Sequence, residues 1–132
     1  MSQASIAGQP ATVRRAKHLR PPLVPGGVIT ALAHTLASAH RSFSEHVAQQ
    51  EGRAGYMAFL ARAAPRYLAM LDNLRVEHQR LAGVIAALRV KLLRAEASQW
   101  ESLVAEADAV MHAIADHDAL ESEMLRDALE GA

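Results

Sequence analysis

The chain contains no cysteine among its 132 residues. This absence excludes disulfide scaffolds and thiolate metal sites, so any metal ion must be bound by imidazole, carboxylate or water. Long apolar stretches are lacking too, because no run approaches the ~20 residues of a membrane span and the N-terminus has no apolar signal-peptide core. We therefore expect a soluble, cytoplasmic protein with no membrane partner.

Aromatic residues are scarce, with one Trp, two Tyr and two Phe, and the β-branched residues that favour strands are few. Ala and Leu dominate the 51% of residues that are hydrophobic, and together with Arg and Glu they are strong helix formers. The length is that of one domain, which suffices for a buried core without covalent staples. The composition predicts an all-α protein.

The net charge of zero conceals an uneven distribution of charge along the chain. Residues 1–44 carry five bases and no acid, a balance of +5, whereas residues 96–132 carry ten acids and one base, a balance of −9. A basic arm can bind nucleic acid, but this one has few charges and no interleaved aromatic residues. We expect no nucleic-acid partner, and instead a solvated tail or one that lies on the acidic last helix.

Proline and glycine divide the chain into a leader and one helical domain. Residues 1–27 end in several prolines and glycines that forbid a continuous helix, so we expect a flexible basic leader there. Residues 28–132 form the domain. Its predicted helices cover 28–51, ended by Gly52; 56–63; 65 to about 93, with Pro65 in first position; and 98 to about 129, started by a capping box of Ser98 and Glu101. We predict an up-down bundle of three long helices and one short helix.

Each long helix carries an apolar stripe at alternating steps of three and four residues, which turns one face towards its neighbours. The first stripe contains Leu32, Leu36, Ala39, Phe43, His46 and Gln50, with Glu51 adjacent. The second contains Leu71, Leu74, His78, Leu81, Ile85, Leu88 and Leu92. The last contains Trp100, Leu103, Ala107, Val110, Ile114, His117, Glu121, Met124 and Ala128. A histidine therefore interrupts every stripe, and two of the helices add a carboxylate about one turn later.

These polar interruptions favour a metal site over separate local contacts. An unsatisfied buried polar group costs ~1–3 kcal/mol, and several of them, one set per helix, need a shared partner that a metal ion can supply. His117 and Glu121 lie on the same helix face, whereas His46 and Glu51 are offset by about 140° and would address two neighbouring ions or flank one. A hydrogen-bonded core histidine at position 78, or an internal hydrogen bond between His117 and Glu121, is the simpler alternative.

Three segments resemble hemerythrin-like, or HHE cation-binding, domains, and they follow the order of that family's motifs. They read H-R-S-F-S-E-H-V-A-Q-Q-E-G (40–52), L-R-V-E-H-Q-R-L-A-G-V-I-A-A-L (74–88) and H-A-I-A-D-H-D-A-L-E-S-E-M-L (112–125). The resemblance covers residues 28–129 and implies a four-helix-bundle type of fold with non-haem iron. Carried over by position, it implies the iron ligands His46, Glu51, His78, His117 and Glu121. Gln50 and Glu77 flank them and are expected to support the ligands.

The chain departs from the family pattern at three places. The stretch that would provide a further histidine, on a helix before position 28, is the proline-rich leader. Gln50 occupies the place of the glutamate one turn after His46, and Ala82 replaces a histidine found in oxygen-carrying members. These departures leave open one iron or two, a site completed by water or by another chain, and a degenerate site.

The function implied by this resemblance is iron-dependent binding or sensing of O2, NO or peroxide. We find no nucleophile–base pair, phosphate loop or cofactor motif, so we do not expect an enzyme, although a small di-iron oxidase or peroxidase is a third hypothesis. The alternative is a helical interaction module with a degenerate metal site that binds a partner through its acidic last helix.

Assembly can also be predicted from the missing fourth long helix. Three long helices bury their stripes less completely than four, which leaves an apolar flank for association. We expect this flank at Val104, Met111 and Leu125, or at Val47 and Leu60, and with it a homodimer.

Overall fold

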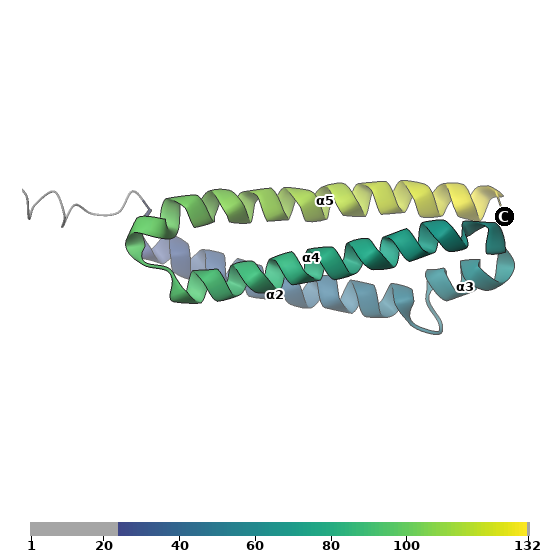
Figure 1. Ribbon diagram of the computed structural model, residues 1–132, viewed down its shortest axis with the longest axis horizontal. Helices are drawn as coiled ribbons and strands as arrows, with labels where there is room; N and C mark the ends of the chain where they lie inside the picture. Colours follow the sequence, from purple (N-terminus) through teal and green to yellow (C-terminus); the bar gives the residue numbers. More distant parts are fainter. Residues whose placement is uncertain (1–23, 132) are drawn as a thin grey trace, which may run out of the picture.

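The computed structural model describes residues 24–131, and all of its regular secondary structure is helical (Figure 1). The elements are α2 (Gly26–Glu51), α3 (Tyr56–Ala63), α4 (Leu68–Arg94) and α5 (Trp100–Gly131), with 3₁₀ turns at Pro65–Tyr67 and Ala97–Gln99. The predicted all-α class and the three long helices are confirmed. Within residues 24–131 there is no fourth long helix, so a hemerythrin-type four-helix bundle stays a prediction.

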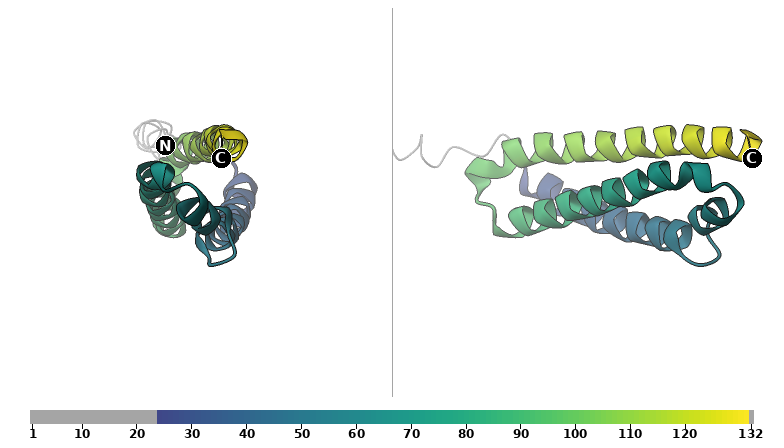
Figure 2. Two further views of the ribbon diagram at one scale, coloured as in Figure 1. Left: turned by 90° about the vertical axis from the view of Figure 1, so that its right-hand side faces the viewer. Right: turned by 45° about the vertical axis from the view of Figure 1, so that its right-hand side comes forward.

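The three long helices run along one common axis in alternating directions. α2 and α5 run in the same direction. α4, which lies between them in the chain, runs in the opposite direction (Figure 1). Seen end-on, they occupy the corners of a triangle (Figure 2). α2 and α5 are close where α2 begins and farther apart where it ends, and α3 lies at that wider end.

The helix boundaries follow the local sequence, with two corrections. α2 begins at Gly26, two residues before the expected start, and residues 1–23 of the predicted leader lie outside the described residues. The capping box predicted at Ser98 and Glu101 is wrong. The cap lies earlier, where the Glu96 backbone N–H donates to Gln99 Oε1 at 2.9 Å, and Ser98 falls inside the 3₁₀ turn that follows.

The sharp turn after α2 depends on Gly55. A Cβ at this position would collide with the backbone carbonyls of Gln49 and Gln50, so no other residue fits without moving the chain. This close approach folds α3 back towards the bundle, where Met57 and Leu60 are buried.

The core consists of two apolar clusters separated by a polar layer. The larger cluster contains Leu36, Phe43, Leu81, Ile85, Leu88, Leu92, Leu103, Ala107 and Val110. The smaller contains Met57, Leu60, Leu71, Leu74, Leu125 and Ala128. Among residues 24–131, the buried polar side chains are His78, His117 and Glu121, and in sequence they fall between the two clusters. The clusters therefore enclose the polar layer from both ends of the bundle.

The predicted stripes agree well with the burial pattern. All seven stripe residues of α4 are buried. On α5, Leu125 rather than Met124 is buried, because α3 packs across this end of the bundle. For the same reason Leu60 and Leu125 do not form the exposed flank that we expected for a dimer, and Val47, Val104 and Met111 are half-buried.

Within the described part of the chain, no helix combines the length and the apolarity that crossing a bilayer requires.

Candidate metal centre

Each long helix contributes one histidine to the polar layer: His46 from α2, His78 from α4 and His117 from α5. The aromatic ring of Phe43 lies against all three imidazoles, with centroid separations of 6.4, 6.0 and 6.2 Å. The His78 and His117 rings are 5.0 Å apart and packed edge to face. The structure therefore brings together three histidines that lie up to 71 positions apart in sequence.

The carboxylate of Glu121 is the centre of this layer. Its Oε1 lies 3.0 Å from His46 Nε2 and also accepts a hydrogen bond from the Gln50 amide. Its Oε2 lies 2.8 Å from both His78 Nε2 and His117 Nε2. One buried carboxylate thus contacts all three of the predicted histidines and the glutamine that was expected to support the ligands.

Glu51, a predicted iron ligand, contacts His78 from the side opposite Glu121. Its Oε2 is 2.7 Å from Nδ1 of His78, the ring nitrogen that faces away from Glu121. A carboxylate on the far nitrogen of a metal-binding histidine fixes the proton there and turns the other nitrogen to the ion. The offset of Glu51 from His46 along α2 is what lets it reach His78 behind the cluster.

Glu77 does not support the site directly. It forms an ion pair with Arg80, at 2.6 Å on the surface of α4, and this hydrogen bond is the main reason that its pKa is lowered. Glu77 does line a groove between α4 and α5 that also reaches His117 and Glu121. The adjacency to His78 in sequence therefore predicted proximity to the site but not contact with the ligands.

The electrostatics of the layer keep Glu121 ionised. Burial favours its neutral form, yet hydrogen bonds from His78 and Gln50 and the neighbouring imidazoles of His117 and His78 lower the pKa of Glu121 to about 2. Burial opposes protonation of His78, but its hydrogen bonds to Glu121 and Glu51 outweigh this and raise its pKa. Glu121 is thus held as a carboxylate, the form that can coordinate a metal ion.

The donor set fits a metal ion by chemistry and by spacing. One donor atom from each of His46, His78 and Glu121 forms a group in which all atoms lie within 4.8 Å of one another. Ligands bound at ~2.1 Å to a first-row ion lie ~3 Å apart, close to the N–O distances around Glu121. Imidazole and carboxylate suit iron, zinc and related ions.

A further sign of fit comes from a buried donor atom without a hydrogen bond. His117 Nε2 is close to Glu121 Oε2 but has no hydrogen-bond partner within residues 24–131. Buried polar atoms in native proteins are nearly always satisfied, so an unpaired one calls for an explanation. A metal ion shared with Glu121 would satisfy His117.

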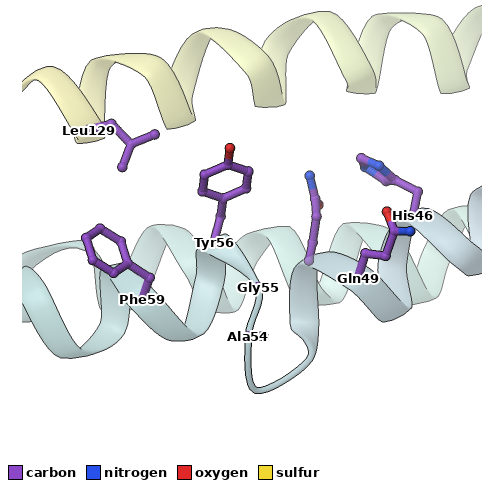
Figure 3. A pocket seen from close by; sticks show the side chains of 8 residues that line it. His46, Gln49, Ala54, Gly55, Tyr56, Phe59 and Leu129 are labelled. Carbon is purple, nitrogen blue, oxygen red and sulfur yellow. The ribbon is translucent and has the colours of Figure 1, made fainter.

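The site is reached from a cavity on the side where α2 and α5 diverge. The cavity of about 630 Å³ is lined by His46, Gln49, Gln50, Ala54, Gly55, Tyr56, Phe59 and Leu129 (Figure 3). A neighbouring cavity of about 580 Å³ shares four of these residues and reaches Glu121. This opening could not be predicted from the sequence, because Tyr56 and Phe59 of α3 are far in sequence from Leu129 of α5 and only the fold brings them together.

Three other described histidines, His34, His40 and His112, lie outside the layer, and His34 is exposed. His40 is half-buried and its Nδ1 accepts a hydrogen bond from Arg89 at 2.7 Å. His112 is exposed, and its Nδ1 lies 2.8 Å from the backbone oxygen of Asp108. His40 and His112 provide controls for the three histidines of the layer.

Comparisons of the chain with protein-family models, with curated proteins and with solved structures give no significant match. The hemerythrin-like resemblance therefore rests on the three sequence segments alone and stays a prediction.

Proposed function

We propose that this protein binds a single transition-metal ion through His46, His78, His117 and Glu121. The observation that supports this most is the convergence of three imidazoles, one from each long helix, on one buried carboxylate. Iron is the ion that the hemerythrin-like resemblance implies, and the nitrogen and oxygen donors are compatible with it.

The proposed roles of the supporting residues follow from their contacts. Glu51 holds the proton on Nδ1 of His78 and leaves Nε2 free to coordinate. Gln50 donates to Glu121 Oε1 and fixes the orientation of the carboxylate. With Glu51 engaged by His78 and an alanine at position 82, the donors present favour one ion over two.

Four protein donors leave room for an exogenous ligand on the ion. The side chain of His46 is 36% exposed and faces the cavity, whereas those of His78, His117 and Glu121 are almost fully buried. An open position on this side would accept O2, NO or peroxide, the ligands implied by the resemblance. When bound, the ion would supply the redox or Lewis-acid chemistry, and these four side chains would hold it.

Metal retention tests this proposal. Protein reconstituted anaerobically with ferrous iron should keep one equivalent after desalting, and His117→Ala and Glu121→Ala should lose most of it. His112→Ala and His40→Ala are the matched controls and should retain iron like the wild type. Equal retention by all four variants, or none by the wild type, would refute the site.

A second candidate is supported by the same contacts. Without a metal ion, Glu121 already has the side chains of His46, Gln50 and His78 as hydrogen-bond partners. The layer would then be a structural polar network in a helical interaction module whose metal site has degenerated. In that case, adding iron, cobalt or zinc would leave the melting temperature unchanged, whereas a ligand that binds only the folded state must raise it.

A further inference from the structure

The cavities beside the proposed metal site are much larger than a diatomic ligand or peroxide requires. Their volumes of about 630 and 580 Å³ fall within the ~300–1,000 Å³ that is typical of pockets for small organic molecules. Both are lined by His46, Gln50, Tyr56 and Leu129, so they form two lobes of one binding surface.

The outer part of this surface is apolar and aromatic. Tyr56 is 57% exposed, Phe59 49% and Leu129 40%, which makes this one of the places where large apolar side chains gather at the surface. Figure 3 shows Phe59 and Leu129 at one end of the cavity, Tyr56 in the middle and His46 at the other end. Rings and aliphatic chains exposed together around a cavity are typical of ligand-binding grooves.

The inner part of the surface is polar and contains an unpaired acceptor. The amide nitrogen of Gln50 donates a hydrogen bond to Glu121. Within residues 24–131, its buried Oε1 has no hydrogen-bond partner. Gln50 lines both lobes, next to the metal donors His46 and Glu121. A ligand with an N–H or O–H group near its metal-binding atoms would satisfy this oxygen.

From these features we propose that the cavity binds a small organic molecule with a metal-coordinating, hydrogen-bond-donating head and an aromatic body. The head coordinates the ion beside His46 and donates to Gln50 Oε1, and the aromatic body packs among Tyr56, Phe59 and Leu129. This inference rests on the proposed metal site and extends its ligands beyond O2, NO and peroxide.

Two hydroxamates that share one head group test the apolar part of the cavity. The cobalt-loaded full chain is titrated calorimetrically with benzohydroxamate and with acetohydroxamate, and its metal content is measured before and after. We expect benzohydroxamate to bind about tenfold or more tightly, because most of its ring would leave water. Phe59→Ala and Leu129→Ala should weaken benzohydroxamate binding and leave acetohydroxamate binding unchanged.

Leu93→Ala is the matched control, since Leu93 is an exposed leucine near the far end of α4 and lines neither lobe. N-methylbenzohydroxamate, which lacks the amide N–H, should bind more weakly than benzohydroxamate if Gln50 Oε1 accepts from the head group.

The outcomes separate this inference from the metal site itself. If the wild type retains cobalt but binds both hydroxamates equally, or if Phe59→Ala and Leu129→Ala behave like Leu93→Ala, the organic ligand is refuted and the metal site stands. If the wild type retains no cobalt before any probe is added, both proposals fail. A cobalt-loaded dimer that buries Phe59 and Leu129 and excludes the probes would also overturn the organic ligand.

Discussion

The two ends of the bundle bury the apolar faces of their helices in different ways. At the end where α2 begins, three helices close around apolar residues such as Leu36, Ile85 and Leu103. Towards the other end, α2 and α5 diverge, the stripes carry histidines and a glutamate, and α3 packs on the smaller apolar cluster beyond them. The first end is explained by packing alone, whereas the second keeps polar groups and an opening that packing does not require.

This contrast indicates which end carries function. Natural sequences are locally consistent with their folds, and the places where they depart from that consistency are often functional sites. Here the departures are confined to one level of the bundle, where His78, His117 and Glu121 interrupt continuous apolar stripes. Substitutions at the two ends should therefore differ in size and in their dependence on metal.

The largest effect is expected at the apolar end. Ile85→Ala removes a fully buried side chain that three helices surround, and such substitutions cost about 2–5 kcal/mol. The loss should be the same with and without metal, because Ile85 lies in the cluster beyond the polar layer. Urea unfolding of both forms measures it, and a loss that metal reverses would break the distinction between the two ends.

At the polar end, Glu121→Ala should destabilise the metal-free protein by about 1–3 kcal/mol, because the buried His78 and its neighbours lose their shared acceptor. Glu123→Ala, an exposed glutamate on the same helix, is the control. Urea midpoints compare the two variants. A Glu121→Ala protein as stable as the control would show that the network contributes nothing to the metal-free fold.

The stability of the metal-free protein should depend on pH on both sides of an optimum. The pKa of Glu121 is lowered from 4.5 to about 2 in the fold, so its contribution is present above pH 4.5 and is lost as the pH falls. The pKa of His78 is raised above 6.5, so its contribution is present below 6.5 and is lost as the pH rises through the raised value. We expect maximal stability between pH 4.5 and 6.5.

Urea midpoints measured across this range test the pH dependence. Glu121→Gln removes the carboxylate and should flatten the acidic limb in particular. A wild-type midpoint that stays constant on both sides of the interval, or an acidic limb that Glu121→Gln leaves intact, would contradict the assignment of these groups.

The smallest effect is expected at Glu77. Its carboxylate is held by Arg80 on the surface, so Glu77→Gln should leave iron retention unchanged. Gln50→Ala, in contrast, removes a hydrogen bond to Glu121 and should lower iron retention. Iron analysis after desalting compares the two variants. A loss of iron in Glu77→Gln would show that Glu77 belongs to the site and that the site opens to the groove between α4 and α5.

The sequence predicts the stripes well and the contacts between them poorly. The seven buried residues of α4 follow from helical periodicity, because burial on a long amphipathic helix is set by spacing within that helix. The contact of Glu51 with His78 joins two helices, so spacing within α2 could not predict it. Ser98 failed as a cap because the chain enters a 3₁₀ turn first.

The cavity and the packing of α3 against α4 and α5 could not be predicted for a related reason, because both depend on contacts between separate helices. Leu60 has the spacing of an exposed flank residue, and its burial results from the turn at Gly55 that folds α3 onto α4 and α5. The homodimer stays a prediction, but two of the five residues proposed for its interface, Leu60 and Leu125, are buried within the chain.

X-ray absorption spectroscopy of the iron-loaded protein tests the central claim most directly, because it reports the atoms bound to the ion. We predict a shell of nitrogen and oxygen with the multiple scattering of imidazole rings from His46, His78 and His117, and no iron–iron scattering. The His117→Ala protein should show one imidazole fewer, and His112→Ala should match the wild type. A shell of oxygen alone, without imidazole scattering, would contradict the proposed site.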